Sequence, residues 1–181
     1  VWFRTDLRLD DNPALISAMK SCDEVIAIYI FSDLQWRLHN ESNIKQEFLF
    51  NNLISLDKAL FQLNIPLIAI NTELFKTVSK DLCSFSVEHK INRVFWNNEF
   101  GVNENERDLL CEKALETINI PISRFNDQVI YEPGFLKTAQ DKPFSVFTPF
   151  KRRWIENFDI NFLDIEEPKI VKKIISIKSD L

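Results

Sequence analysis

The sequence contains only two glycines, Gly101 and Gly134, in 181 residues. At the average glycine content of proteins, about 7%, a chain of this length would contain roughly a dozen glycines. Walker loops and GxGxxG turns both need several residues without a Cβ, so that backbone N–H groups can approach phosphates. The sequence therefore excludes both motifs, and side chains must hold any nucleotide-like ligand.

Cysteine is also scarce, and its three positions, Cys22, Cys83 and Cys111, lie far apart. They form no CxxC pair, and no histidine follows them at the spacing of a zinc ligand. Neither a disulfide framework nor a zinc site is therefore indicated. We expect three reduced thiols and no bound metal.

Long apolar runs and an excess of positive charge are absent as well. No run reaches the roughly 18 to 20 residues of a membrane span, and no signal-peptide pattern is present, which predicts a cytoplasmic protein without a membrane partner. The formal net charge is -5, whereas nucleic-acid-binding domains usually carry a basic surface. The main DNA surface of any larger protein should therefore lie outside this chain. Since the sequence opens with Val1 inside an apparent strand, we expect a fragment. We also expect a monomer.

What is present is an alternation of apolar runs and helical patterns. Runs typical of buried strands begin at Val1 and recur at about 25–31, 66–70, 93–96 and 121–125. Helical patterns lie between them, with Asn12 as the expected N-cap and Pro13 as the first residue of the first helix. The later helices are expected at about 44–63, from Thr72 as N-cap onward, and at about 103–118. The alternation predicts an α/β fold, with a five-stranded parallel Rossmann-like sheet and helices on both faces.

The alternation stops after residue 126. Residues 127–158 are rich in aromatic side chains and are predicted to pack on the α/β domain, with a short helix from Pro149 to about Phe158. Residues 159–181 mix Ile with Lys and Asp, which is typical of an interdomain linker. The predicted organisation is therefore an α/β domain at 1–126, an aromatic extension at 127–158 and a linker at 159–181.

Three predicted loops carry the candidate binding residues. They follow the first, second and fourth strands, and the carboxyl ends of parallel strands meet at one edge of a sheet, where ligands bind. The first loop holds Arg and Asp residues from Arg4 to Asp11, which in the alternative interpretation only pair with one another in solvent. The polar loop at 32–43 holds Trp36 and His39. A lone histidine is usually an ordinary surface or capping residue, and only the meeting of the three loops favours a binding role for His39. The third loop leads into Asn103 and Glu104.

Glu104 is the most informative of these residues. Asn103 and Glu106 fit the N-cap and third positions of a capping box, which leaves Glu104 free to point into the crevice. Its carboxylate could accept two hydrogen bonds from an amino-oxo-pyrimidine edge, such as that of a pterin. The sequence contains no GxSxG, HExxH or kinase-like motif, so it is typical of a ligand-binding domain without a reactive centre.

Four motifs resemble, in the same order, segments of the DNA photolyase and cryptochrome family, and of bacterial class I cyclobutane pyrimidine dimer photolyases in particular. The first is Trp-Phe-Arg-x-Asp-Leu-Arg-Leu-x-Asp-Asn-Pro-Ala-Leu at 2–15. The others are Gln35-Trp36 with His39-Asn40, then Val102-Asn103-Glu104-x-x-Arg107-Asp108, then Phe147-Thr148-Pro149-Phe150-Lys151 with Trp154.

The resemblance implies that this domain binds a light-harvesting antenna, commonly 5,10-methenyltetrahydrofolate, and that His39, Asn103 and Glu104 contact it. It also implies that the catalytic FAD and the groove for damaged DNA lie in a helical domain beyond the linker. The full-length protein would then be a carbon–carbon lyase, a deoxyribodipyrimidine photolyase that splits dimers by light-driven electron transfer. The fragment itself would be inactive alone.

Three other assignments remain open at this point. Cryptochromes keep the same α/β domain but signal instead of repairing DNA. Some relatives bind a deazaflavin through other contacts. A stand-alone nucleotide-binding module of the wider Rossmann-like group is the third, although the shortage of glycine argues against it.

Overall fold

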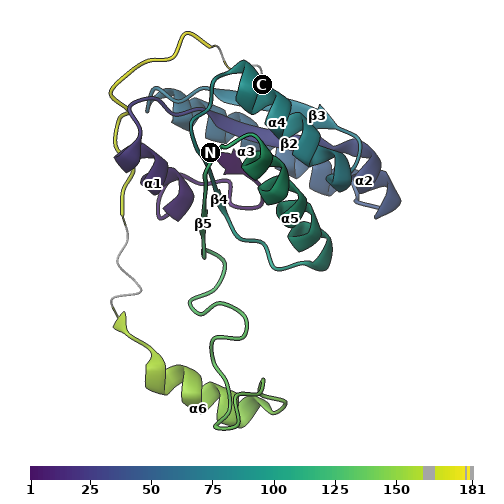
Figure 1. Ribbon diagram of the computed structural model, residues 1–181, viewed down its shortest axis with the longest axis vertical. Coiled ribbons are helices and arrows are strands. Elements are labelled where there is room, and N and C mark those ends of the chain that lie inside the picture. Colours follow the sequence, from purple (N-terminus) through teal and green to yellow (C-terminus); the bar gives the residue numbers. More distant parts are fainter. Residues whose placement is uncertain (161–165, 178, 180–181) are drawn as a thin grey trace.

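Strand β2 (Ala27–Ser32) occupies the middle of a three-stranded parallel sheet in the computed structural model, which describes residues 1–160, 166–177 and 179. It pairs with β1 (Trp2–Phe3) on one side and with β3 (Leu67–Thr72) on the other. A second parallel sheet consists of β4 (Val94–Asn97) and β5 (Ile122–Phe125). Figure 1 shows all these strands in the same α/β body.

The prediction of a single five-stranded sheet was therefore wrong. Strand β4 lies next to β1, but the two strands belong to separate hydrogen-bonded sheets. The physical reason is the length of β1, which has only two residues. Directly after it, the backbone N–H of Arg4 donates to Asp6 Oδ1 at 2.8 Å and not to a neighbouring strand. A side chain links the end of β4 to the segment after β1 instead: Asn97 Nδ2 donates to Asp6 Oδ2 at 2.6 Å. Asn97 Oδ1 also accepts from the Ala14 N–H, at the start of α1, at 3.1 Å.

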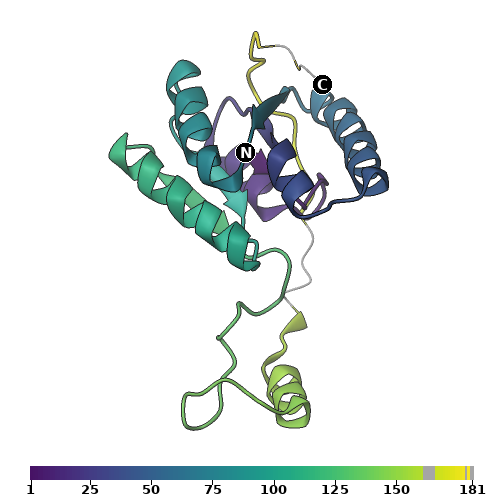
Figure 2. The same ribbon diagram turned by 90° about the vertical axis from the view of Figure 1, so that its right-hand side faces the viewer.

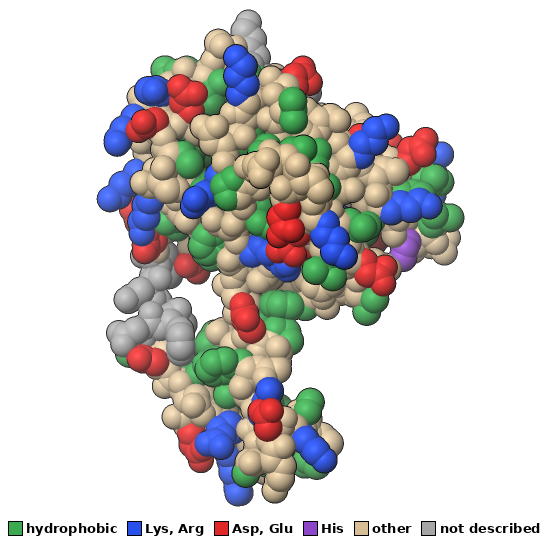
Figure 3. Space-filling model, viewed as in Figure 1, with side chains coloured by type: hydrophobic (Ala, Val, Ile, Leu, Met, Phe, Trp, Pro, Cys, Tyr) green, Lys and Arg blue, Asp and Glu red, His purple; other side chains and the backbone are tan. Residues whose placement is uncertain are grey.

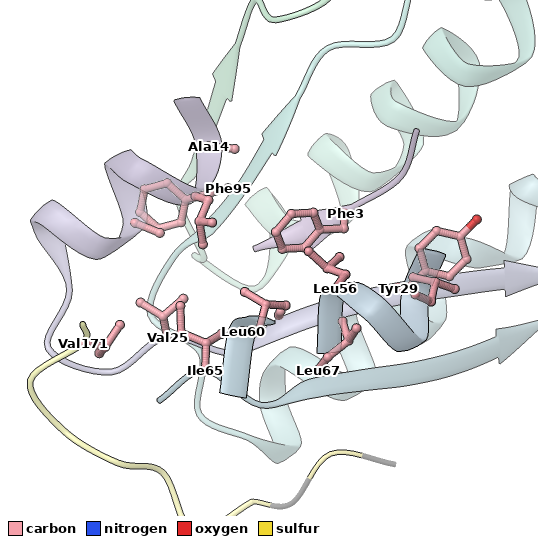
Figure 4. Close-up of a cluster of buried hydrophobic side chains, with 14 residues drawn as sticks. Phe3, Ala14, Val25, Tyr29, Leu56, Leu60, Ile65, Leu67, Phe95 and Val171 are labelled. Atoms are coloured by element: carbon pink, nitrogen blue, oxygen red, sulfur yellow. The ribbon is translucent and has the colours of Figure 1, made fainter. Parts of the chain in front are cut away.

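Two pairs of helices cover opposite faces of the strands, as Figure 2 shows. Helices α1 (Pro13–Ser21) and α3 (Asn43–Phe61) enclose one core, which contains Phe3, Tyr29 and Phe95 (Figure 4). Helices α4 (Val78–Glu88) and α5 (Val102–Thr117) enclose the other. The apolar stripe of α3 buries its leucines at steps of three and four, namely Leu53, Leu56 and Leu60.

The start of α1 confirms the predicted cap. Asn12 Oδ1 accepts from the Leu15 N–H at 3.1 Å, and Pro13 is the first helical residue. Burial of Asn12 is complete, and its amide also donates to the carbonyl oxygens of Asp6 and Arg8. Asn12 thus caps a helix and orders the loop before it.

Three local predictions were wrong. Residues 32–43 are not only a loop, because α2 (Asp33–Leu38) forms there. Thr72 ends β3 and caps no helix; the chain continues through a short 3-10 helix, η1 (Phe75–Thr77), into α4. Helix α5 starts at Val102 with Gly101 as its N-cap, so Asn103 and Glu106 form no capping box.

The residues after β5 leave the body and then return to it. Helix α6 (Phe147–Asn157) lies apart from the sheets in Figures 1 and 2. Further on, Val171 is 3% exposed, and its N–H donates to the Leu63 carbonyl at 3.1 Å. Ser179 Oγ donates to the Leu67 carbonyl at 2.8 Å. The described part of the tail is therefore tied to the α/β body, while residues 161–165, 178, 180 and 181 of the predicted linker lie outside the described residues.

Candidate ligand-binding pocket

A pocket of about 520 Å³ opens at the carboxyl edge of the strands. Its volume falls within the range of about 300–1,000 Å³ that is usual for small-molecule sites. Residues that follow β1, β2 and β4 line it, and α3 closes it with Lys45, Phe48 and Leu49. The three loops predicted from the sequence thus meet at one pocket, and His39, Asn103 and Glu104 all line it.

A buried network of charged side chains forms one wall. Arg4 donates to both carboxylate oxygens of Asp108 at 2.8 Å, and Arg107 Nη2 donates to Asp108 Oδ1 at 2.8 Å. Arg107 Nη2 also donates to Glu99 Oε2 at 2.8 Å. All four side chains are less than a tenth exposed. Two guanidinium groups and two carboxylates therefore balance in charge, as buried ions must.

Glu99 belongs both to this network and to the lining of the pocket. Burial alone would raise the pKa of its carboxyl group, but the nearby guanidinium groups of Arg4 and Arg107 and a hydrogen bond from Thr5 hold that pKa below its ordinary value. Thr5 Oγ1 donates to Glu99 Oε1 at 2.7 Å. Glu99 is therefore ionised at neutral pH, and protein donors occupy both of its oxygens.

Both guanidinium groups also stack on an aromatic ring. Both Arg4 and Arg107 lie 4.8 Å from the centroid of the Trp2 ring. Arg4 Nη2 is buried and has no hydrogen-bond partner among the described residues. Because a guanidinium group is attracted to an aromatic face, stacking on Trp2 offsets part of the cost of this missing bond.

The loop residues from Arg4 to Asp11 do not simply pair with one another in solvent. Arg4 and Asp6 are buried, and Arg8 forms an ion pair with Asp127, which is distant in sequence. Asp6 Oδ2 accepts from Asn97 Nδ2 at 2.6 Å. This loop therefore builds the base of the pocket.

Glu104 occupies the third position of α5, not the first. In the described part of the chain its carboxylate has no hydrogen bond or ion pair, although it lines the pocket. The side chain folds back over Gly101, where a Cβ would lie 1.9 Å from Glu104 Oε2. Gly101 thus makes room for this carboxylate, which remains free to accept hydrogen bonds from a ligand.

His39 lies at the exposed end of α2, at the rim of the same pocket. Its Nε2 is 2.8 Å from Gln35 Nε2. The two side chains therefore contact each other at the rim of the pocket. Asn103 is exposed at the second position of α5. Whether these two residues and Glu104 hold a cofactor remains a prediction.

Sequence reasoning missed several lining residues, including Tyr29, Glu99 and Phe48. Tyr29 lies inside an apolar strand, so the pattern assigned it to the core. Glu99 is the second residue after β4, and its position at the carboxyl end of a strand was the available signal.

The described residues contain neither a membrane-spanning helix nor a metal-binding cluster. No helix there is long and apolar enough to span a bilayer. Among residues 1–160, 166–177 and 179, no group of three His, Cys, Asp or Glu side chains could hold a metal ion.

Comparison with known proteins identifies the family. The DNA photolyase family profile matches residues 1–169. The deoxyribodipyrimidine photo-lyase of Vibrio cholerae is 32% identical over 181 residues, which cover all of this chain and 39% of that protein. The Escherichia coli enzyme of the same name is 37% identical over 157 residues, or 86% of this chain and 33% of that protein.

The fold agrees with this assignment. A bacterial class III photolyase from Agrobacterium tumefaciens superposes with a TM-score of 0.76 at 25% identity, covering 99% of this chain and 36% of that one. The chain belongs to the DNA photolyase family. It spans little more than a third of the length of these relatives.

Proposed function

We propose that this chain is the N-terminal, antenna-binding part of a deoxyribodipyrimidine photolyase. The observation that carries the proposal is the unpaired Glu104 carboxylate in a pocket built from the ends of β1, β2 and β4. The sequence similarity to bacterial photo-lyases over nearly the whole chain supports it. The repair activity itself would belong to the whole protein, with FAD and the groove for damaged DNA beyond this chain.

The residues of the pocket fit a folate antenna. Glu104 offers two free oxygens to the amino-oxo-pyrimidine edge of a pterin, and Asn103 and His39 add polar contacts at the rim. Trp36 and Phe48 provide apolar surface for a flat heterocycle. When bound, 5,10-methenyltetrahydrofolate would absorb near-ultraviolet light and pass the excitation energy to FAD.

The surface charge of the chain is consistent with a domain that binds the antenna while another domain binds DNA. On the face shown in Figure 3, Lys and Arg side chains are interspersed with Asp and Glu and form no continuous basic stripe. With a net charge of -5, the chain lacks the usual electrostatic footprint of a DNA-binding domain. Our proposed organisation has an α/β domain at 1–126, an extension at 127–158 and a linker at 159–181 that leads to the helical domain.

The direct test is an absorption spectrum of the whole protein, purified in dim light and then illuminated with dimer-containing DNA. A flavin spectrum with an additional near-ultraviolet band, followed by loss of dimers, would support a folate-antenna photolyase. A flavin spectrum without repair would instead favour a cryptochrome-type receptor. Absence of any chromophore would contradict the proposed antenna-binding role.

The role of Glu104 can be tested separately. Glu104→Ala removes two charge-assisted acceptors, so the affinity of the whole protein for 5,10-methenyltetrahydrofolate should fall at least about tenfold. Glu106→Ala is the matched control, because Glu106 is exposed in the same helix and does not line the pocket. Equal affinities of the two variants would remove Glu104 from the site.

A further inference from the structure

Tyr29 connects the core with the pocket. It lies in β2, is 8% exposed, and packs in the cluster that includes Phe3, Leu56 and Leu67. Its ring meets the Phe31 ring edge to face, with centroids 4.8 Å apart. In Figure 4 the Tyr29 oxygen points away from the other labelled side chains. The ring is thus held by the core, and the residue also lines the pocket.

The Tyr29 hydroxyl forms no hydrogen bond with any other group in the described part of the chain. The oxygen is also not among the fully buried unpaired side-chain atoms of the described residues, so it is accessible from the pocket that Tyr29 lines, where a ligand atom can reach it. The nearby carboxylates cannot easily supply a partner. Glu99 accepts from Thr5 and Arg107, and Asp6 accepts from the Arg4 N–H and from Asn97.

The surroundings also determine the charge state of this hydroxyl. Burial, and then the negative charge of Glu99, raise the pKa of Tyr29 above its ordinary value. The side chain therefore stays a neutral phenol, which can both donate and accept a hydrogen bond. The carboxylates of Glu99 and Asp6, which both raise this pKa, also disfavour a negatively charged ligand group at this end of the pocket.

We propose that the Tyr29 hydroxyl is a ligand-binding group at the buried end of the pocket, where it bonds to an uncharged polar atom of a heterocycle. The inference rests on the proposed function, in which that heterocycle is the pterin ring of the antenna. Tyr29 and Glu104 then hold the ligand from two elements, β2 and α5. The core fixes the Tyr29 ring in advance, so little side-chain freedom is lost on binding.

The test is Tyr29→Phe, which removes one oxygen atom and keeps the ring. The affinity of the whole protein for 5,10-methenyltetrahydrofolate should fall about fivefold or more, the usual effect of losing one hydrogen bond. The melting temperature without ligand should not fall, because the hydroxyl has no partner in the protein. Tyr131→Phe is the matched control, since Tyr131 is the other tyrosine of this chain and lies outside the pocket. The affinity of this variant for the folate should be unchanged.

Nuclear magnetic resonance of protein labelled with ¹³C at tyrosine Cζ gives an independent readout. Addition of the folate should shift the Tyr29 signal and leave the Tyr131 signal in place. The inference is overturned if Tyr29→Phe binds as tightly as the unchanged protein while Glu104→Ala binds more weakly, a result that leaves the proposed function intact. A lower melting temperature with unchanged affinity would likewise assign the hydroxyl a structural role. If the unchanged protein binds no folate, the proposed function and this inference both fail.

Discussion

Arg4 Nη1 donates to both carboxylate oxygens of Asp108, each at 2.8 Å. Arg4 directly follows β1 of the three-stranded sheet, whereas Asp108 lies in α5, which follows β4 of the two-stranded sheet. The two sheets share no ladder of backbone hydrogen bonds. This ion pair therefore joins the two halves of the body beside the pocket.

Breaking this pair should be costly. Asp108→Asn leaves Arg4 and Arg107 buried with one carboxylate fewer, so the free energy of unfolding should fall by about 3 kcal/mol or more. Denaturant unfolding measures the change. Glu156→Gln is the control, because the exposed pair with Arg153, at 4.0 Å, should contribute less than about 1 kcal/mol. Similar decreases in the free energy of unfolding of the two variants would contradict a structural role for the buried network.

Glu99 should make the stability depend on pH. The pKa of its carboxyl group is lower in the folded protein than its ordinary value. Its contribution is therefore complete above the ordinary range of a glutamate and is lost as the pH falls through the folded-state pKa. The stability difference between the unchanged protein and Glu99→Gln, measured by urea unfolding, should shrink from pH 7 toward pH 3. A difference that stays constant over this range would refute the prediction.

Asn12→Ala should destabilise the protein more than an ordinary cap substitution does. A lost cap costs about 1 kcal/mol, and here the substitution also leaves a buried amide of Asn97 without the acceptor that lies 2.9 Å away. A total of about 2–4 kcal/mol is expected from these two effects. Ser42→Ala, which removes the exposed cap of α3, should cost only about 1 kcal/mol or less. Thermal unfolding of both variants measures the change. Equal losses of unfolding free energy in Asn12→Ala and Ser42→Ala would show that Asn12 acts only as a helix cap.

The tail should stabilise the α/β body through Val171. Val171→Ala removes two buried carbons and leaves a small cavity, so the free energy of unfolding should fall by about 2 kcal/mol. Ile170→Ala is a matched control at the neighbouring position, because Ile170 is 68% exposed, and it should change stability by less than about 0.5 kcal/mol. Denaturant unfolding measures both changes. Equal free energies of unfolding for the two variants would show that the tail does not complete the core.

The order of strands and helices could be predicted from the sequence because it depends on local patterns. The unbroken apolar run before Ser32 required a strand buried on both faces, and Asn12 with Pro13 required a helix start. The leucine spacing of α3 likewise determined which side of that helix is buried. The family could also be recognised from short motifs, since residues 1–169 match its profile.

Only the tertiary structure decided how the strands join and which polar groups remain free. The short β1 divides the strands into two hydrogen-bonded sheets, and the Arg4–Asp108 ion pair spans 104 positions in sequence, beyond the reach of any local pattern. Tyr29 belongs to the core by its sequence pattern, yet its hydroxyl lies at the pocket without a partner in the described chain. Hydrogen-bond satisfaction depends on which distant groups come together. For that reason the sequence determined where the pocket lies, and the fold determined which of its atoms are available to a ligand.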